Sequence, residues 1–134
     1  MHPIFHMLFQ KTRLLSKELN DALKPHNLYS SQWMVIYCVH MYGSMTMKEV
    51  SGYLNVEAPT VTRTVSRLEK LGWLTVQPGK DRREKIVCLS VQAEKKLPEI
   101  ERTIIQFEAG FLEKLTEDEQ EQTMNLLSKL ERKV

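Results

Sequence analysis

The sequence predicts a mainly α-helical fold with one small β-hairpin. Apolar residues recur at helical spacing in long segments at both ends of the chain, 4–24 and 91–114. Between them, two short helical segments separated by a three-residue turn lead into two strand-like segments, 73–77 and 85–89. A length of 134 residues, with 42% hydrophobic and 27% charged residues, is typical of a single soluble domain.

The N-terminal segment 4–24 is predicted to be an amphipathic helix. Its apolar residues fall close to a single stripe, which consists of Ile4, Leu8, Leu15, Leu19, Ala22 and Leu23. Pro25 should end this helix, because the residue before a proline is disfavoured in the helical region.

A second helix is predicted over residues 32–42. Ser30 or Ser31 should cap its start, because a serine hydroxyl can accept a hydrogen bond from an amide of the first turn. Gly43 should end it, since glycine commonly occupies the position just after a helix.

A helix-turn-helix is predicted to follow. Thr46 and Glu49 have the spacing of a capping box, in which each side chain accepts a hydrogen bond from a free amide at a helix start. This helix should end near Leu54, and a second one should span 58–71 after the turn at 55–57. The residues of the second helix expected to face the core are Val61, Val65, Leu68 and Leu71.

Two further helices are predicted after the hairpin. Ser90 should cap a long helix that runs to about Lys114 and is bent in its first turns by Pro98. Its apolar seam is Leu97, Ile100, Ile104, Phe107, Phe111 and Leu115. Thr116 and Glu119 form a second capping box and open a last helix. Its residues expected to face inward are Met124, Leu127, Leu130 and Val134.

The terminal helices carry more apolar surface than a small helix-turn-helix core can cover. We therefore expect a homodimer in which segments 1–25 and 91–134 form the dimerisation helices. Segment 28–90 is then a winged-helix lobe, in which the hairpin is the wing.

The free face of the 58–71 helix is rich in hydroxyl and cationic side chains. The candidate DNA-binding residues there are Pro59, Thr60, Thr62, Arg63, Ser66, Arg67 and Lys70. An α-helix fits the major groove of DNA, where an arginine can donate two hydrogen bonds to guanine. Arg63 is our first choice for a base contact, and Arg67 and Lys70 are expected to anchor phosphates. An ordinary solvated helix face is the alternative, although serine and threonine are weak helix formers.

The hairpin loop is a second candidate DNA contact. Its charged residues are Lys80, Asp81, Arg82, Arg83 and Lys85. A guanidinium on a thin loop can enter a narrow minor groove, where the negative potential is enhanced. Asp81 would repel DNA if it stood alone, so we expect it to pair with Arg83 and hold that side chain extended. A generic solvated charge cluster is the alternative interpretation.

The charges are unevenly distributed along the chain. Residues 44–89 hold eight lysines and arginines against five acidic residues, whereas residues 90–134 hold seven against ten. The cationic excess therefore lies around the suspected DNA-binding segment, as an electrostatic footprint for phosphate requires.

Several other classes of protein lack support. The sequence has no glycine-rich phosphate loop, no zinc-protease or serine-hydrolase motif and no paired carboxylates, so we expect neither an enzyme nor a cofactor. His2 and His6 have the i, i+4 spacing of a metal pair, but no third ligand is visible. Cys38 and Cys88 lie in apolar segments and are interpreted as reduced structural thiols, with a redox switch as the alternative.

No apolar run approaches the length of a membrane span, and segment 1–9 lacks the features of a secretory signal. We therefore expect a cytoplasmic protein without a membrane partner.

The motifs together resemble the MarR (multiple antibiotic resistance regulator) family of winged-helix repressors. Segment 60–72 is similar to that family's recognition helix, and Asp81, Arg82 and Arg83 before the second strand are similar to its wing. Segments 28–33 and 48–54 also match, so the resemblance covers nearly the whole chain in order.

The resemblance implies a homodimeric repressor that binds a pseudo-palindromic, inverted-repeat operator in double-stranded DNA. It also implies a small-molecule effector pocket between the dimer helices and the DNA-binding lobe, and the candidate pocket residues are Trp33, Tyr37, His40 and Met41. Aromatic residues at helical spacing can equally belong to the core. A winged-helix module that binds proteins and no longer reads DNA is the alternative function.

Overall fold

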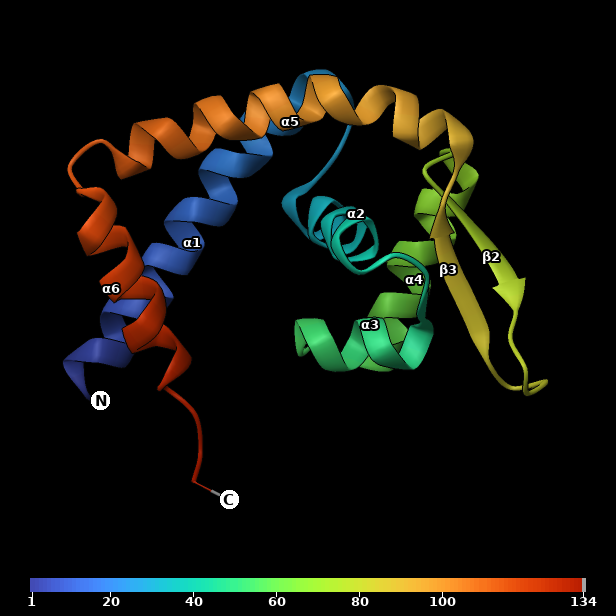
Figure 1. Cartoon of the computed structure of the whole chain (residues 1–134), viewed down its shortest axis with the longest axis horizontal. Helices are drawn as coiled ribbons and strands as arrows, with labels where there is room; N and C mark the ends of the chain where they lie inside the picture. Colours follow the sequence, from blue (N-terminus) through green and yellow to red (C-terminus); the bar gives the residue numbers. More distant parts are fainter. Residues whose placement is uncertain (134) are drawn as a thin grey trace.

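A computed structural model describes residues 1–133. The helices are α1 (Pro3–Leu23), a 3-10 turn η1 (Lys24–His26), α2 (Ser30–Tyr42), α3 (Met47–Leu54), α4 (Ala58–Lys70), α5 (Val91–Leu112) and α6 (Glu117–Ser128). The strands are β1 (Met45–Thr46), β2 (Leu74–Pro78) and β3 (Lys85–Leu89). Figure 1 shows that α5 arches over the molecule and joins two parts: α1 and α6 at one end, and α2, α3, α4 and the sheet at the other.

The sheet is antiparallel with strand order β1–β3–β2. In the hairpin, Leu74 lies opposite Leu89 and Pro78 lies opposite Lys85, so the predicted wing is confirmed. The strand β1 was not predicted, because two residues are too few to show an alternating pattern. Met45 pairs with Val87 in this strand, which fixes the start of α3 against the edge of the wing.

The hydrophobic core lies mainly in the winged-helix lobe. Its largest fully buried side chains are Leu23, Ile36, Leu68, Leu74, Ile100, Val39, Val50, Val61, Val65 and Val87. Helices α2, α3 and α4 pack on one another, and α4 also packs on β2. The first half of α5 closes this core with Ala93, Leu97 and Ile100, which are all buried.

The predicted start of α2 was wrong. Tyr29 is the N-cap residue, and its N–H donates to Gln32 Oε1 at 2.9 Å. Ser30 is the first residue of α2 and not its cap, and its N–H donates to Asn20 Oδ1 of α1 at 2.6 Å. A side chain ten residues earlier therefore replaces the serine cap that the local sequence suggested.

The end of α1 also differs in detail from the prediction. Lys24, which precedes Pro25, keeps helical angles of φ −50° and ψ −45°, and the chain passes directly into η1. The helical path stops at Asn27, which has a left-handed φ of 56°. Asparagine tolerates this conformation better than most residues do.

Several apolar residues of the predicted stripe, seam and inward faces are exposed in the single chain. In α1, Leu23 is buried and Leu19 is half-buried, whereas Ile4 and Leu15 are exposed. Exposed apolar side chains of the C-terminal region are Phe111, Leu115, Met124, Leu127 and Leu130. The remaining predicted position, Val134, lies outside the described residues. Leu71, the C-cap of α4, is 41% exposed, so its predicted burial was also wrong.

Candidate nucleic-acid interface

Local interactions fix the start of α3 and the turn that leads into α4. The Thr46 hydroxyl accepts from the Glu49 N–H, and the Glu49 carboxylate accepts from the Thr46 N–H, each at 3.0 Å, so the predicted capping box is confirmed. The turn after α3 is closed by Asn55, whose φ is 54°. The side chain of Glu57, the N-cap of α4, makes no capping hydrogen bond. Pro59 has no N–H to offer, and the other amides of the first turn are not capped by Glu57 and can bind an anion.

The predicted polar face of α4 is exposed as one surface. Val61, Val65 and Leu68 are buried on the opposite side and hold the helix in place. The exposed residues of the face are Pro59, Thr60, Thr62, Arg63, Ser66, Arg67 and Lys70. Arg63 Nη2 lies 3.3 Å from Thr60 Oγ1 and donates to it, so the guanidinium is drawn toward the N-terminal end of the helix.

The wing loop is held by its own backbone. The N–H of Gly79 donates to the carbonyl of Glu84, and the N–H of Glu84 donates to the carbonyl of Asp81, each at 2.9 Å. The Asp81 carboxylate accepts from the backbone N–H of Arg83 at 3.3 Å. The expected ion pair with the Arg83 guanidinium is not formed. Asp81 shapes the loop through the backbone instead, and the Arg83 side chain is left exposed.

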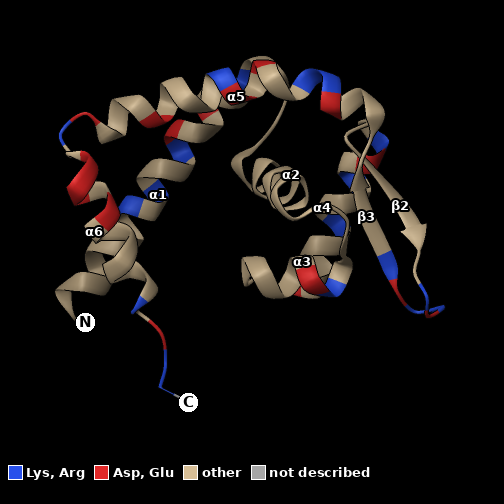
Figure 2. Ribbon diagram, in the orientation of Figure 1, with Lys and Arg blue, Asp and Glu red and all other residues tan. Residues whose placement is uncertain are grey.

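A hollow of about 470 Å³ brings the wing and α4 together. Thr62 of α4 and Arg83 and Lys85 of the wing line it. Lys48, in the first turn of α3, lines the same hollow and was not among the predicted site residues. Its place two residues after the Thr46 cap, in the first turn of the helix-turn-helix, is the signal that could have identified it. Figure 2 shows lysines and arginines on α4 and toward the tip of the wing.

The four candidate pocket residues line a single groove, named here the α2–α5 groove. It has a volume of about 510 Å³, and its walls come from α1, α2 and α5. Besides Trp33, Tyr37, His40 and Met41, it is lined by Leu19, Met34, Glu101, Ile104, Ile105, Phe107 and Glu108. His40 Nε2 lies 3.4 Å from Glu101 Oε1 and connects α2 with α5 across the groove.

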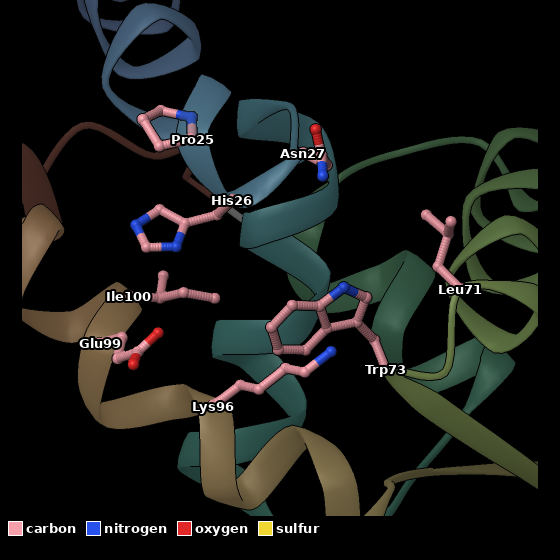
Figure 3. Close-up of a pocket in the computed structure, with 8 residues that line it drawn as sticks. All are labelled: Pro25, His26, Asn27, Leu71, Trp73, Lys96, Glu99 and Ile100. Atoms are coloured by element: carbon pink, nitrogen blue, oxygen red, sulfur yellow. The ribbon is translucent and has the colours of Figure 1, made fainter.

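A smaller hollow of about 310 Å³ lies where η1, the end of α4, the start of the wing and α5 meet (Figure 3). Lys96 Nζ lies 5.7 Å from the ring centre of Trp73. His26 Nε2 is within 2.7 Å of Thr103 Oγ1, which joins η1 to α5. These contacts fix the orientation of α5 over the base of the wing.

The weaker candidate groups have structural explanations. His2 caps α1, because its Nδ1 accepts from the N–H of Ile4 at 3.1 Å. Cys38 is fully buried against Met45, and its burial raises the pKa of the thiol. Cys88 is half-buried, with its Sγ 3.1 Å from Ser44 Oγ. Within residues 1–133, no cluster of three or more His, Cys, Asp or Glu side chains is arranged to hold a metal ion.

Among the described helices, none combines the length and the apolar character that crossing a membrane would require.

A helix-turn-helix followed by a β-wing, with exposed cations on both, defines the class of winged-helix DNA-binding proteins. Residues 28–85 match the sequence profile of the MarR family. The chain is 48% identical over 118 residues to the uncharacterized HTH-type transcriptional regulator YwoH of Bacillus subtilis strain 168, a match that covers 88% of this chain and 86% of that protein. The chain belongs to the MarR family and is a DNA-binding transcriptional regulator.

Solved structures have the same fold. A mutant MarR from E. coli complexed with operator DNA aligns with a TM-score of 0.87 at 22% identity, covering 97% of this chain and 94% of that one. A MarR family transcriptional regulator from Silicibacter pomeroyi aligns with a TM-score of 0.87 at 26% identity, covering 96% and 87%. The long α5 arch and the terminal helices are therefore part of the shared fold.

Proposed function

We propose that the protein is a homodimeric repressor that binds an inverted-repeat operator and is released from it by a small-molecule effector. Segment 28–90 is the DNA-binding lobe, and segments 1–25 and 91–134 are the dimerisation helices. The protein acts by binding alone, without catalysis. Because its target is chromosomal DNA, it works in the cytoplasm.

The main support for this proposal is the apolar surface that the terminal helices leave exposed. On α1 it consists of Ile4, Phe5, Met7, Phe9, Leu14 and Leu15. Toward the C-terminus it consists of Ile105, Phe111, Leu112, Leu115, Met124, Leu126, Leu127 and Leu130. Soluble monomers rarely expose apolar patches of this extent, so a second copy of the chain is its natural cover. Figure 1 places α1 and α6 together at the end of the molecule that is remote from the wing.

Two copies related by a two-fold axis present two α4 helices to one face of DNA. Successive major grooves are about 34 Å apart, so the operator should be an inverted repeat with half-sites one helical turn apart. In each half-site Arg63 contacts a base, while Arg67, Lys70 and Lys48 contact phosphates. The wing, with Arg83 exposed, reaches the adjacent minor groove. A mutant E. coli MarR with the same fold has been solved in complex with operator DNA, which supports DNA binding by this fold.

The α2–α5 groove is proposed as the effector site. Its walls belong to both parts of the molecule, since α2 is in the DNA-binding lobe and α5 carries the dimerisation surface. A ligand wedged between them would change the orientation of α4 relative to its copy in the dimer. Because operator binding depends on the spacing of the two α4 helices, such a ligand would weaken it.

The proposal is tested by selecting genomic fragments that bind the purified protein. We expect an enriched inverted repeat, a dimer by light scattering, and gel-shift affinity that falls steeply between low and high salt as counterions return to the DNA. A duplex with one half-site scrambled should bind much more weakly. A strict monomer, or a protein that binds no duplex even at low salt, would overturn the proposal and favour a protein-binding module.

A further inference from the structure

The walls of the α2–α5 groove are mainly apolar and aromatic. Trp33 and Tyr37 of α2 lie with their ring centres 6.1 Å apart on one wall. Phe107 of α5 is half-buried on the other wall, and its ring centre lies 5.1 Å from that of Phe111. A volume of about 510 Å³ lies within the range that holds a drug-sized organic molecule. The groove is therefore shaped for a ligand with an aromatic body.

The charged side chains of the groove are almost all negative. Glu101 and Glu108 of α5 line it, and no lysine or arginine of the described residues does. The two glutamates are seven residues apart, so both lie on one side of the helix, about 10 Å apart along its axis. Among the described residues, the only basic side chain in the lining is His40, which already contacts Glu101. Within residues 1–133, Glu108 forms no ion pair.

We infer that the α2–α5 groove binds an organic monocation whose aromatic body lies between α2 and α5 and whose charged end faces Glu101 and Glu108. This inference rests on the effector-site part of the proposed function and names the class of effector. A cation is attracted by both carboxylates and by the faces of the aromatic rings. A carboxylate ligand would instead lie beside two like charges in a groove with no lysine or arginine to compensate for them.

The test is calorimetric titration of the full-length protein with three probes of one shape: naphthylmethylammonium, naphthylmethanol and naphthoate. The ammonium should bind about tenfold tighter than the alcohol, and naphthoate should bind weakest. In the double variant Glu101→Gln/Glu108→Gln, the preference for the cation should disappear while the alcohol binds as before. The matched control, Glu94→Gln/Glu113→Gln, removes two carboxylates of α5 and its C-cap outside the groove lining and should keep the preference.

Tyr37→Ala locates the site, because loss of one aromatic wall should weaken both the ammonium and the alcohol several-fold. Thermal melts show that each variant is folded. Binding of naphthoate as tight as that of the ammonium, or tighter, would overturn the inference. Failure of all three probes to bind would also overturn it and would mean that the partner copy or bulk solvent fills the groove. Gel shifts without probe are run in parallel. If the probes fail but the protein still binds its operator, only the inference about the effector is rejected. If the protein does not bind its operator, the proposed regulator function is refuted separately.

Discussion

The Ser90 hydroxyl donates to the carbonyl of Gly72 at 2.6 Å and accepts from the N–H of Ala93 at 3.0 Å. In addition, the N–H of Ser90 donates to the carbonyl of Trp73 at 3.0 Å. One residue therefore joins the end of α4 and the base of the wing to the first turn of α5. Together with the His26–Thr103 and His40–Glu101 contacts, this residue holds α5 against the winged-helix lobe.

Ser90→Ala should destabilise the fold by about 1–3 kcal/mol, because it removes the cap of α5 and leaves the Gly72 carbonyl without its donor. Urea unfolding followed by circular dichroism measures the change. Ser90→Thr keeps the hydroxyl and is the control, with a loss well below that of alanine. Equal stability of the alanine variant and the wild type would show that water replaces the serine at no cost.

Arg63→Ala should cost about 1–3 kcal/mol of operator binding and relax specificity at one base position. The exposed guanidinium on the first turns of α4 is placed for a base edge. Arg67→Ala is the comparison, since loss of a phosphate contact weakens binding on every sequence and lowers the salt slope by about one. Competition gel shifts on operator and random DNA measure both. If Arg63→Ala lost the same affinity on both DNAs, its role in base recognition would be rejected.

Arg83→Ala should weaken binding most on operators whose flanks have a narrow minor groove. The side chain is free to enter that groove, because Asp81 binds the Arg83 backbone and not its guanidinium. The measurement compares duplexes with A-tract flanks and with GC-rich flanks. Lys95→Ala, on the exposed surface of α5, is the control. The prediction fails if the variant loses equal affinity on both duplexes.

The features that the sequence predicted correctly depend on neighbouring residues. Thr46 with Glu49, Thr116 with Glu119, and Ser90 all cap helices as their spacing indicated. These hydrogen bonds span three residues, so no knowledge of the rest of the fold is needed to expect them. Burial of Val61, Val65 and Leu68 in α4 followed in the same way from their periodicity.

The features that were missed depend on residues distant in the chain. Asn20 supplies the acceptor at the start of α2, and no local pattern marks a side chain ten residues away. Lys48 joins the candidate site because α3 is held beside the wing. The outward apolar residues of α6, such as Met124, were assigned to an inner face that a single copy of the chain does not provide.

Cys38 should resist alkylation in the native protein, because it is fully buried and its burial raises the pKa of the thiol, so little of the reactive thiolate forms. Mass spectrometry after iodoacetamide treatment should find Cys88, which is half-buried, modified first. In Cys88→Ser, modification of Cys38 should require denaturant. Rapid native labelling of Cys38 would instead point to a redox role for this residue.

The second capping box predicts an acid-dependent helix start. The Glu119 carboxylate accepts from the backbone N–H of Thr116 at 2.9 Å, and hydrogen bonding to Thr116 holds the pKa of Glu119 below its usual range. The pKa of Glu119 is lower in the folded protein than in the unfolded chain, where it is about 4.3, so the charged carboxylate stabilises the fold. This stabilisation is complete above the unfolded pKa and is lost as the pH falls through the folded pKa. Carbon-detected NMR titration of the Glu119 carboxyl measures the shift directly.

Glu119→Gln retains a capping acceptor without the charge, so α6 in this variant should lose this part of its acid sensitivity. If acid destabilises α6 equally in the variant and the wild type, the effect comes from the other carboxylates of the first turn, Glu117 and Asp118.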